Sequence, residues 1–326
     1  LFCGYMLAAH GYQPILLERG ADVDQRTKDV EAFWENGQLN LSSNVQFGEG
    51  GAGTFSDGKL NTLVKDKFGR NHEVLRIFAE HGAPESITYE SKPHIGTDVL
   101  SAVVKEMRKY ICAHGGEVRF HSQVTDIQTH SDNGQKILRK LKIYDSQKKE
   151  TYLLDTDLAV FAIGHSARDT FSMLYHHGLP MQPKAFAVGV RIEHPQEMIN
   201  QDQYGKNYPS FLPAAPYKLT ANLDNGRGVY TFCMCPGGYV VNASSEEHRL
   251  AVNGMSYSRR DSQNANTAVI VTVSPDDFES DHPLAGVEFQ RKLEEAAYLE
   301  GNGKVPVQLF GDFCENRPSV QLGTVT

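Results

Sequence analysis

The first twenty residues constrain the fold most, because they combine an apolar helix, a stop signal, a short apolar run and an acid. Residues 1–10 have the composition of an apolar helix, and Gly11 is a typical helix end. Residues 13–20 then hold a short apolar run, closed by Glu18 and Gly20, which predicts a buried parallel strand. This order is half of a nucleotide-binding βαβ unit, whose acid follows the glycine-rich phosphate loop by roughly 20 residues. That loop would precede Leu1, and a surface glutamate after an ordinary strand is the alternative.

A second constraint comes from residues 47–60, which hold five glycines among hydroxyl residues and one cation, Lys59. Glycine lets the backbone approach a ligand closely, so that successive N–H groups can cradle a phosphate or a polar ring edge. The segment is not a P-loop, since no Gly-Lys-Ser/Thr closes it. A glycine linker is the alternative, although linkers seldom combine aromatic, acidic and lysine residues in so few positions.

The rest of the chain predicts two domains, residues 1–182 and residues 183–326, the second of them rich in strands. In the first, we expect helices over 22–36 and 97–116, strands of an antiparallel meander over 117–120, 123–129, 137–144 and 151–154, a buried strand over 158–164, and a helix up to Gly178. In the second, we expect strands over 185–193, 229–233, 239–243 and 268–273, helices over 195–202 and 284–299, and a turn-rich segment over 253–266.

Composition narrows the classes of protein that remain. The chain has 326 residues with a formal net charge of −8, and its 40% of apolar residues argue against wholesale disorder. The negative charge gives no general reason to expect nucleic acid or an anionic membrane as a partner. Neither a membrane span nor a secretory signal is recognisable, which favours a cytoplasmic location. Five cysteines without a Cys-x-x-Cys pair predict neither a disulfide scaffold nor a metal site.

Five segments together closely resemble a family of FAD-dependent dehydrogenases, also described as NAD(FAD)-utilising dehydrogenases. They are residues 16–20 (LLERG), 47–60 (FGEGGAGTFSDGKL), 162–170 (AIGHSARDT), 186–195 (FAVGVRIEHP) and 231–238 (TFCMCPGG), so the resemblance covers nearly the whole chain. It implies a glutathione-reductase-type α/β fold, in which a three-layer, Rossmann-like FAD/NAD(P)-binding domain carries an inserted β-rich α+β domain. The phosphate loop and a closing C-terminal segment of that fold are not seen in the sequence, so we expect a domain truncated at both ends.

The resemblance also implies which residues bind FAD. Glu18 would accept hydrogen bonds from the adenosine ribose hydroxyls, with Arg19 along the adenine or pyrophosphate, and Val124 would offer backbone groups to adenine. Gly164 would pass close to the cofactor, with Ser166 beside it. The residues implied to run beside the pyrophosphate, ribityl chain and isoalloxazine edge are Gly48, Gly50, Gly51, Ala52, Gly53, Thr54, Ser56, Asp57 and Gly58.

Two residues are catalytic candidates. Lys59 could stabilise the anionic reduced flavin from its pyrimidine end, or lie in solvent as a loop lysine. His165 could donate a proton to a substrate or to flavin N5, although a structural, hydrogen-bonding role is the better single interpretation. Arg191, Arg259 and Arg260 could bind an acidic substrate or lie at the surface, and the residues of the Cys233-Met234-Cys235 run are expected to be structural thiols.

The function that follows is a flavin-dependent oxidoreductase, which passes a hydride or electron pair between FAD and an unidentified small molecule. NAD(P)H is a candidate electron donor, but no second Gly-x-Gly-x-x-Gly motif is present to mark a nicotinamide domain. The alternative is an FAD-containing binding or RNA-modifying protein whose β-rich domain docks a macromolecule. A third alternative is a scaffold that keeps the fold without a cofactor. The sequence leaves the substrate and the oligomeric state open.

Overall fold

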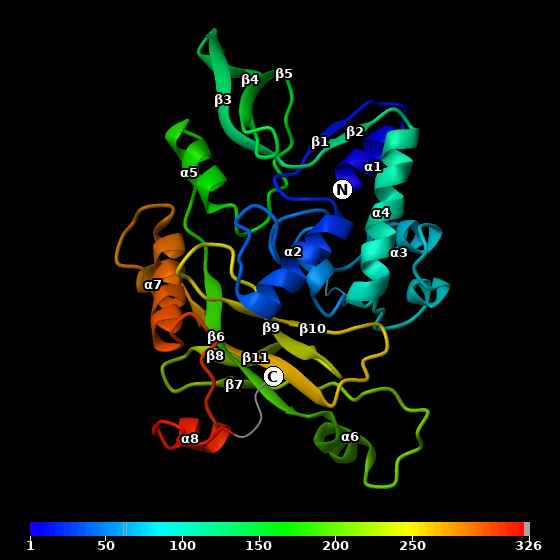
Figure 1. Cartoon of the computed structure of the whole chain (residues 1–326), viewed down its shortest axis with the longest axis vertical. Coiled ribbons are helices and arrows are strands. Elements are labelled where there is room, and N and C mark those ends of the chain that lie inside the picture. Colours follow the sequence, from blue (N-terminus) through cyan, green and yellow to red (C-terminus); the bar gives the residue numbers. More distant parts are fainter. Residues whose placement is uncertain (61, 63, 323–326) are drawn as a thin grey trace. The chain divides into compact units, whose positions relative to one another are not determined.

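The chain divides into two compact units in the computed structural model, which describes residues 1–60, 62 and 64–322 (Figure 1). The first unit holds Leu1–Gln182 and Met255–Arg260, and the second holds Pro183–Gly254 and the residues from Asp261 onward. The backbone therefore leaves the first unit once, returns to it for a short segment, and leaves it again. Both units combine helices with open sheets, so the expectation of a mixed α/β fold is confirmed at this level.

The first unit contains a parallel strand pair and an antiparallel meander. Its helices are α1 (Phe2–Ala9), α2 (Val23–Asn36), α3 (Arg70–Glu80), α4 (Thr97–Ala113) and α5 (Arg168–His176), and its strands are β1 (Ile15–Leu17), β2 (Glu117–Arg119), β3 (Ser122–Asp132), β4 (Gln135–Asp145) and β5 (Glu150–Asp155). β1 and β2 pair in parallel, with Leu16 opposite Val118. β3, β4 and β5 form three of the four expected strands of the antiparallel meander. The assignment of residues 117–120 to that meander is wrong, because β2 finds its neighbour in β1 and pairs with it in parallel.

Helix α4 supplies much of the apolar core of this unit. Its buried residues Leu100, Val103, Met107 and Ile111 recur every three or four positions, which places them on one face of the helix. That face packs against buried residues of α1 and α3 in one cluster, and α1 and α4 are neighbours in space (Figure 1). The amphipathic pattern of the sequence therefore predicts both the helix and its buried side.

The strand expected over residues 158–164 is not formed. Leu158 and Val160 are 80% and 65% exposed, whereas Ala159 and Phe161 pack against a cluster that includes Leu17 of β1. The alternation is that of an extended chain, but no described strand pairs with this run. An apolar run becomes a strand only when a neighbouring strand satisfies its backbone groups, and composition alone carries no information about that neighbour.

The second unit is built around a four-stranded antiparallel sheet in the order β6-β11-β8-β7. The strands of the whole unit are β6 (Phe186–Pro195), β7 (Thr220–Asn222), β8 (Gly228–Cys235), β9 (Tyr239–Asn242), β10 (Val252–Met255) and β11 (Asn264–Val273). Its helices are α6 (Gln196–Tyr204), α7 (Ala285–Glu300) and α8 (Phe310–Cys314). Ala285 and Phe289 of α7 pack with Phe186 of β6 and Val273 of β11 in one apolar cluster. The expected turn-rich segment 253–266 is shorter than predicted, because β10 and β11 occupy its two ends.

Within the described residues, none of the helices is both long enough and apolar enough to cross a membrane.

Candidate functional site

The carboxylate of Glu18 lies directly after β1 and is fixed by backbone groups. Its Oε1 accepts hydrogen bonds from the N–H of Gly20 at 2.9 Å and from the N–H of Gly48 at 3.0 Å. Among the described residues, no donor reaches its Oε2. The same carboxylate therefore joins the end of β1 to the start of the glycine-rich segment, and one of its oxygens is left to accept hydrogen bonds from a ligand.

Arg26 holds the glycine-rich segment from inside the protein. Its side chain is fully buried on α2, and its guanidinium donates to the carbonyls of Asn44 at 2.9 Å, Val45 at 3.0 Å and Glu49 at 2.6 Å. The guanidinium carbon also lies 4.9 Å from the centroid of the Phe55 ring, a cation–π contact. Burial lowers the pKa of Arg26 to about 10, against the opposing effect of nearby carboxylates, so the side chain stays protonated at neutral pH.

Glu49 fixes the same segment to two helices. Its Oε2 accepts from the N–H of Val23 in the first turn of α2 at 2.8 Å, and its Oε1 forms an ion pair with Nε of Arg108 on α4 at 2.8 Å. Burial raises the pKa of the Glu49 carboxyl, and the Val23 N–H and the Arg108 guanidinium oppose that rise. A carboxylate at a helix N-terminus is also stabilised by the helix dipole.

The glycines of this segment fall into two groups. At Gly48, Gly50 and Gly58, which have φ of +121°, +86° and +70°, a Cβ atom would lie 2.3 Å from Cδ of Arg26, 2.1 Å from Oγ1 of Thr54 and 1.6 Å from the carbonyl oxygen of Ile95. At Gly51 and Gly53, by contrast, a Cβ would meet no atom within 4 Å. The first group allows the segment to pack closely on its supports, whereas the second exposes backbone to open space.

The hydroxyl groups of the segment bond to its own backbone. Thr54 is fully buried, and its Oγ1 donates to the carbonyl of Glu49 at 3.4 Å. The Ser56 hydroxyl donates to the carbonyl of Gly53 at 2.7 Å and accepts from the N–H of Gly58 at 3.2 Å. Ala52 begins a short 3-10 helix that ends at Phe55. These side chains shape the segment, while Gly53 is exposed.

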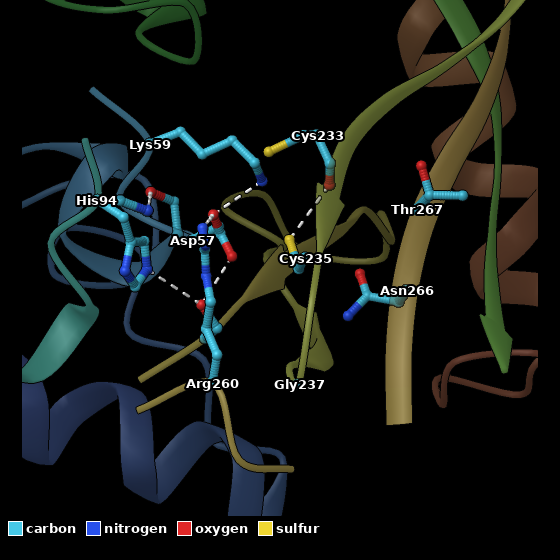
Figure 2. Close-up of polar contacts among 12 residues, drawn as sticks. Asp57, Lys59, His94, Cys233, Cys235, Gly237, Arg260, Asn266 and Thr267 are labelled. Carbon is cyan, nitrogen blue, oxygen red and sulfur yellow. Dashed lines mark hydrogen bonds and ion pairs between the residues drawn. The ribbon is translucent and has the colours of Figure 1, made fainter. Parts of the chain in front are cut away.

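A charged cluster surrounds Asp57, which is fully buried (Figure 2). Its Oδ2 receives both Nζ of Lys59 at 2.8 Å and Nη2 of Arg260 at 2.5 Å, while its Oδ1 accepts from the Ser256 hydroxyl at 2.7 Å. Nε2 of His94 lies 3.5 Å from the same hydroxyl oxygen. All five residues belong to the first unit.

The electrostatics of this Asp57 cluster are set by competition between burial and charge. Burial pushes the pKa of the Asp57 carboxyl upward, but Lys59 and Arg260 outweigh that effect and hold its pKa below the usual value. Burial lowers the pKa of His94, and the positive charge of Arg260 lowers it further. At neutral pH the cluster therefore holds one carboxylate, two cations and a neutral imidazole.

Arg19 and Val124 lie beside a shallow cavity between β3 and α5. Nη2 of Arg19 contacts the Asp169 carboxylate at 2.8 and 3.0 Å, and its guanidinium carbon lies 4.4 Å from the centroid of the Phe47 ring. The cavity, of about 240 Å³, is lined by Gln123, Val124, Thr125, Asp169, Thr170 and Met173. The structure thus gives Arg19 protein partners and places Val124 at a hollow of the surface.

Gly164, His165 and Ser166 lie in the loop before α5. Gly164 has φ of +69°, and an added Cβ would meet no atom within 4 Å. The backbone conformation therefore favours glycine at this position, whereas packing does not require it. Nδ1 of the exposed His165 is 2.8 Å from the hydroxyl of its neighbour Ser166. This contact is of the kind expected for a hydrogen-bonding structural histidine.

In the second unit, Cys233 and Cys235 are not joined in a disulfide. Cys233 has φ of +47° where β8 and β11 lose register, and its carbonyl accepts from Nη2 of Arg191 at 2.7 Å. The same carbonyl accepts from Sγ of Cys235 at 3.2 Å (Figure 2). Nε of Arg191 donates to the amide oxygen of the buried Asn266 at 3.0 Å. Arg191 therefore ties β6 to the irregular stretch of β8 and to β11, which is a structural role.

The sequence analysis does not single out three residues that fix the glycine-rich segment or contact the Asp57 cluster: Arg26, Glu49 and His94. For Arg26 a signal exists, because it is spaced three residues from Val23 and four from Val30, on the apolar face of α2. An arginine on a buried helix face needs hydrogen-bond acceptors for its guanidinium, so its position predicts that another segment packs there with its carbonyl groups. His94 had no local signal, since it reaches the cluster through a bridge between its backbone and that of Lys59.

Comparison with known proteins adds a family model and one curated relative. Residues 185–326 match the model described as "FAD-dependent protein, C-terminal domain-like". An uncharacterized protein of Clostridium beijerinckii is 53% identical over 330 residues, which cover 100% of this chain and 60% of that protein. The chain thus spans about three fifths of the length of the curated relative that it matches.

Solved structures are similar to this chain at low identity. Thermovibrio ammonificans THI4 is 17% identical, with a TM-score of 0.35 over 55% of this chain and 58% of that protein. The aklavinone-11 hydroxylase in a ternary complex with FAD and aklavinone is 12% identical, with a TM-score of 0.33 over 89% of this chain and 48% of that protein.

Proposed function

We propose that this protein is a flavin-dependent oxidoreductase and that its first unit binds FAD. Two independent lines support the proposal. The second unit matches a family model whose description is that of an FAD-dependent protein. The first unit carries, in the glycine-rich segment and at the end of β1, the residues that the resemblance to FAD-dependent dehydrogenases implies for FAD binding.

The observation that carries the proposal is the geometry of Glu18. Its two oxygens have different tasks: Oε1 is held by the N–H groups of Gly20 and Gly48, and Oε2 meets no donor among the described residues. A carboxylate that is oriented by backbone and still has an acceptor left suits a ligand with vicinal hydroxyls, such as the ribose of a dinucleotide. It also follows a strand of a parallel pair, where such ligands bind in open α/β sheets.

The glycine-rich segment fits the rest of such a ligand through its backbone. The open space at Gly51 and Gly53 would admit a phosphate or the edge of a flat ring, whereas Arg26 and Glu49 fix the segment from the protein side. Because its hydroxyls bond to its own carbonyls, the segment would bind with N–H groups and need little rearrangement. FAD, when bound, supplies the capacity to take up and release a hydride or electron pair.

Further parts of the proposal follow from the resemblance. We infer a Rossmann-like arrangement of the first unit, the second unit as an inserted β-rich domain, and an unidentified small molecule as the substrate. Lys59 keeps its candidate role near the cofactor, but it shares Asp57 with Arg260. NAD(P)H is the electron donor to test first, and nothing in the composition favours nucleic acid as a partner.

The test is the absorbance spectrum of the protein purified at its full natural length, with and without added FAD, followed by anaerobic NADH, NADPH and dithionite. Flavin bands that a nicotinamide bleaches would make it a pyridine-nucleotide-dependent enzyme. Bands that only dithionite bleaches would indicate a substrate that reduces FAD directly. If no FAD is retained or taken up, the proposal fails.

Substitution of Glu18 tests directly whether its carboxylate binds the ribose of FAD. Glu18→Gln keeps an oxygen for the two backbone N–H groups and changes only the outer atom, so we expect intact folding and FAD affinity weakened about tenfold to a hundredfold, the range of one charged hydrogen bond. Glu31→Gln, an exposed change on α2, is the matched control. Equal FAD affinity in the two variants would remove Glu18 from the site.

A further inference from the structure

We propose that Lys59 and Arg260 form a binding site for an anionic group of the substrate, a carboxylate or a phosphate, and that Asp57 is the residue that holds the two cations together. The inference rests on the proposed function, because the site lies on the same glycine-rich segment that we propose for FAD. It assigns a substrate class, small acidic molecules, to that function.

The first argument is the balance of charge. Both cations converge on one oxygen of Asp57, at 2.8 and 2.5 Å, while the other oxygen is occupied by Ser256. Within this cluster one buried carboxylate pairs with two positive charges, so the side chains around Asp57 carry more positive than negative charge. The protein has a net charge of −8, so this local excess runs against its overall composition.

The second argument concerns solvent access to the two cations and one buried donor of Arg260. The side chains of Lys59 and Arg260 are 31% and 22% exposed, whereas that of Asp57 is 1% exposed, so the outward part of the cluster is cationic. Nε of Arg260 is buried and, in the described part of the chain, has no hydrogen-bond partner. An unsatisfied buried donor is costly, and an anionic oxygen brought to the guanidinium would offset that cost.

The third argument is how Arg260 is brought to the cluster. The Met255–Arg260 segment is fixed to the start of α4: the Ser256 carbonyl accepts from the N–H of Thr97 at 3.2 Å, and the Asp98 carboxylate accepts from the N–H and hydroxyl of Ser258 at 2.9 and 2.7 Å. Arg260 then adopts φ of +52°, a strained conformation for a residue with a side chain. Strain of this kind persists where the surroundings fix the residue, and here it aims a guanidinium at Asp57.

The neighbouring imidazole does not cancel this positive field. His94 lies close to Ser256, and both burial and Arg260 lower its pKa, as expected beside an excess of positive charge. A neutral imidazole has one N–H group, which can donate a hydrogen bond to an anion, and it carries no charge of its own. The cluster therefore offers two cations and one further polar group within a single unit.

The experiment measures anion binding to the FAD-loaded protein, so that the phosphates of FAD itself are already accounted for. Sodium phosphate and sodium malonate are titrated at constant ionic strength, and the flavin spectrum and the thermal unfolding temperature are followed. We expect saturable effects with millimolar dissociation constants, weakened at least tenfold in Lys59→Gln and in Arg260→Gln. Whichever probe binds more tightly tells a phosphate site from a carboxylate site.

Two further variants separate binding from folding. Lys65→Gln removes an exposed cation of the same unit and should leave both titrations unchanged. Arg260→Lys keeps the charge but lacks the buried Nε donor, so it should restore only part of the effect. If Lys59→Gln or Arg260→Gln binds anions as wild type does, or if wild type shows no saturable response, the inference is overturned. A loss of FAD affinity in both Gln variants without any anion effect would assign the cations to the cofactor and also overturn it.

The outcome is distinguishable from failure of the proposed function. If wild type binds no FAD, the titrations are repeated on the protein without FAD. A saturable response that Lys59→Gln and Arg260→Gln abolish would then support the anion site alone, and its absence would refute both proposals.

Discussion

Replacing Arg26 by methionine should destabilise the first unit by about 3–5 kcal/mol. The change removes the guanidinium donors of the carbonyls of Asn44, Val45 and Glu49, residues that are at most 6% exposed, and leaves only the Thr54 hydroxyl at 3.4 Å on the Glu49 carbonyl. At roughly 1–3 kcal/mol for each buried acceptor that loses its guanidinium donor, the gross loss over the three is about 3–9 kcal/mol. Methionine also removes the cost of keeping a charge in the interior, which the lowered pKa of Arg26 reflects, so the net loss lies in the lower half of that range.

The assay is urea unfolding followed by circular dichroism, with limited proteolysis to report where the chain opens. The midpoint should fall, and new cleavage should appear within residues 44–58, because Arg26 is the residue that fixes this stretch from inside. Lys28→Met, an exposed change on the same helix, is the matched control. If Arg26→Met stays within about 1 kcal/mol of the control, the guanidinium does not hold the segment and the reasoning is wrong.

Two other predictions concern the same part of the chain. Gly58→Ala should cost about 3 kcal/mol, because φ is +70° and the new Cβ would lie 1.6 Å from the Ile95 carbonyl oxygen, whereas Gly53→Ala should be nearly neutral; thermal unfolding of both variants checks this. The lowered pKa of His94 means that the unfolded state binds its proton more readily, so stability should fall as the pH drops from above 6.5 toward the lower pKa of the folded state. His94→Asn should flatten the stability curve in that window and His10→Gln, at an exposed site, should not; a curve unchanged by His94→Asn would contradict the shift.

Local patterns predicted the elements whose stability is local. Helix α4 follows from its apolar spacing, and the β3–β5 meander follows from short alternating runs separated by turns. The prediction of a strand over residues 158–164 is wrong. A strand needs a neighbouring strand to pair with, and an apolar run does not show whether one is present. The same limit applies to the Asp57 cluster, whose members lie up to 203 positions apart in the sequence.

For the glycine-rich segment, the sequence predicts one property of the site and the structure adds another. Its composition predicts a backbone that can approach a ligand, but not which side faces that ligand. The structure supplies the missing direction: Arg26, Glu18 and Glu49 contact the segment from the protein, and its own hydroxyls turn inward. The N–H groups of Gly48, Glu49, Gly51, Thr54 and Gly58 already donate within the protein. What a ligand could use is the other backbone N–H groups of the segment, one oxygen of Glu18 and the cations beside Asp57. A site of this composition binds anions and hydroxyls by position, so changes to the buried supports should alter ligand affinity as strongly as changes to residues that touch the ligand.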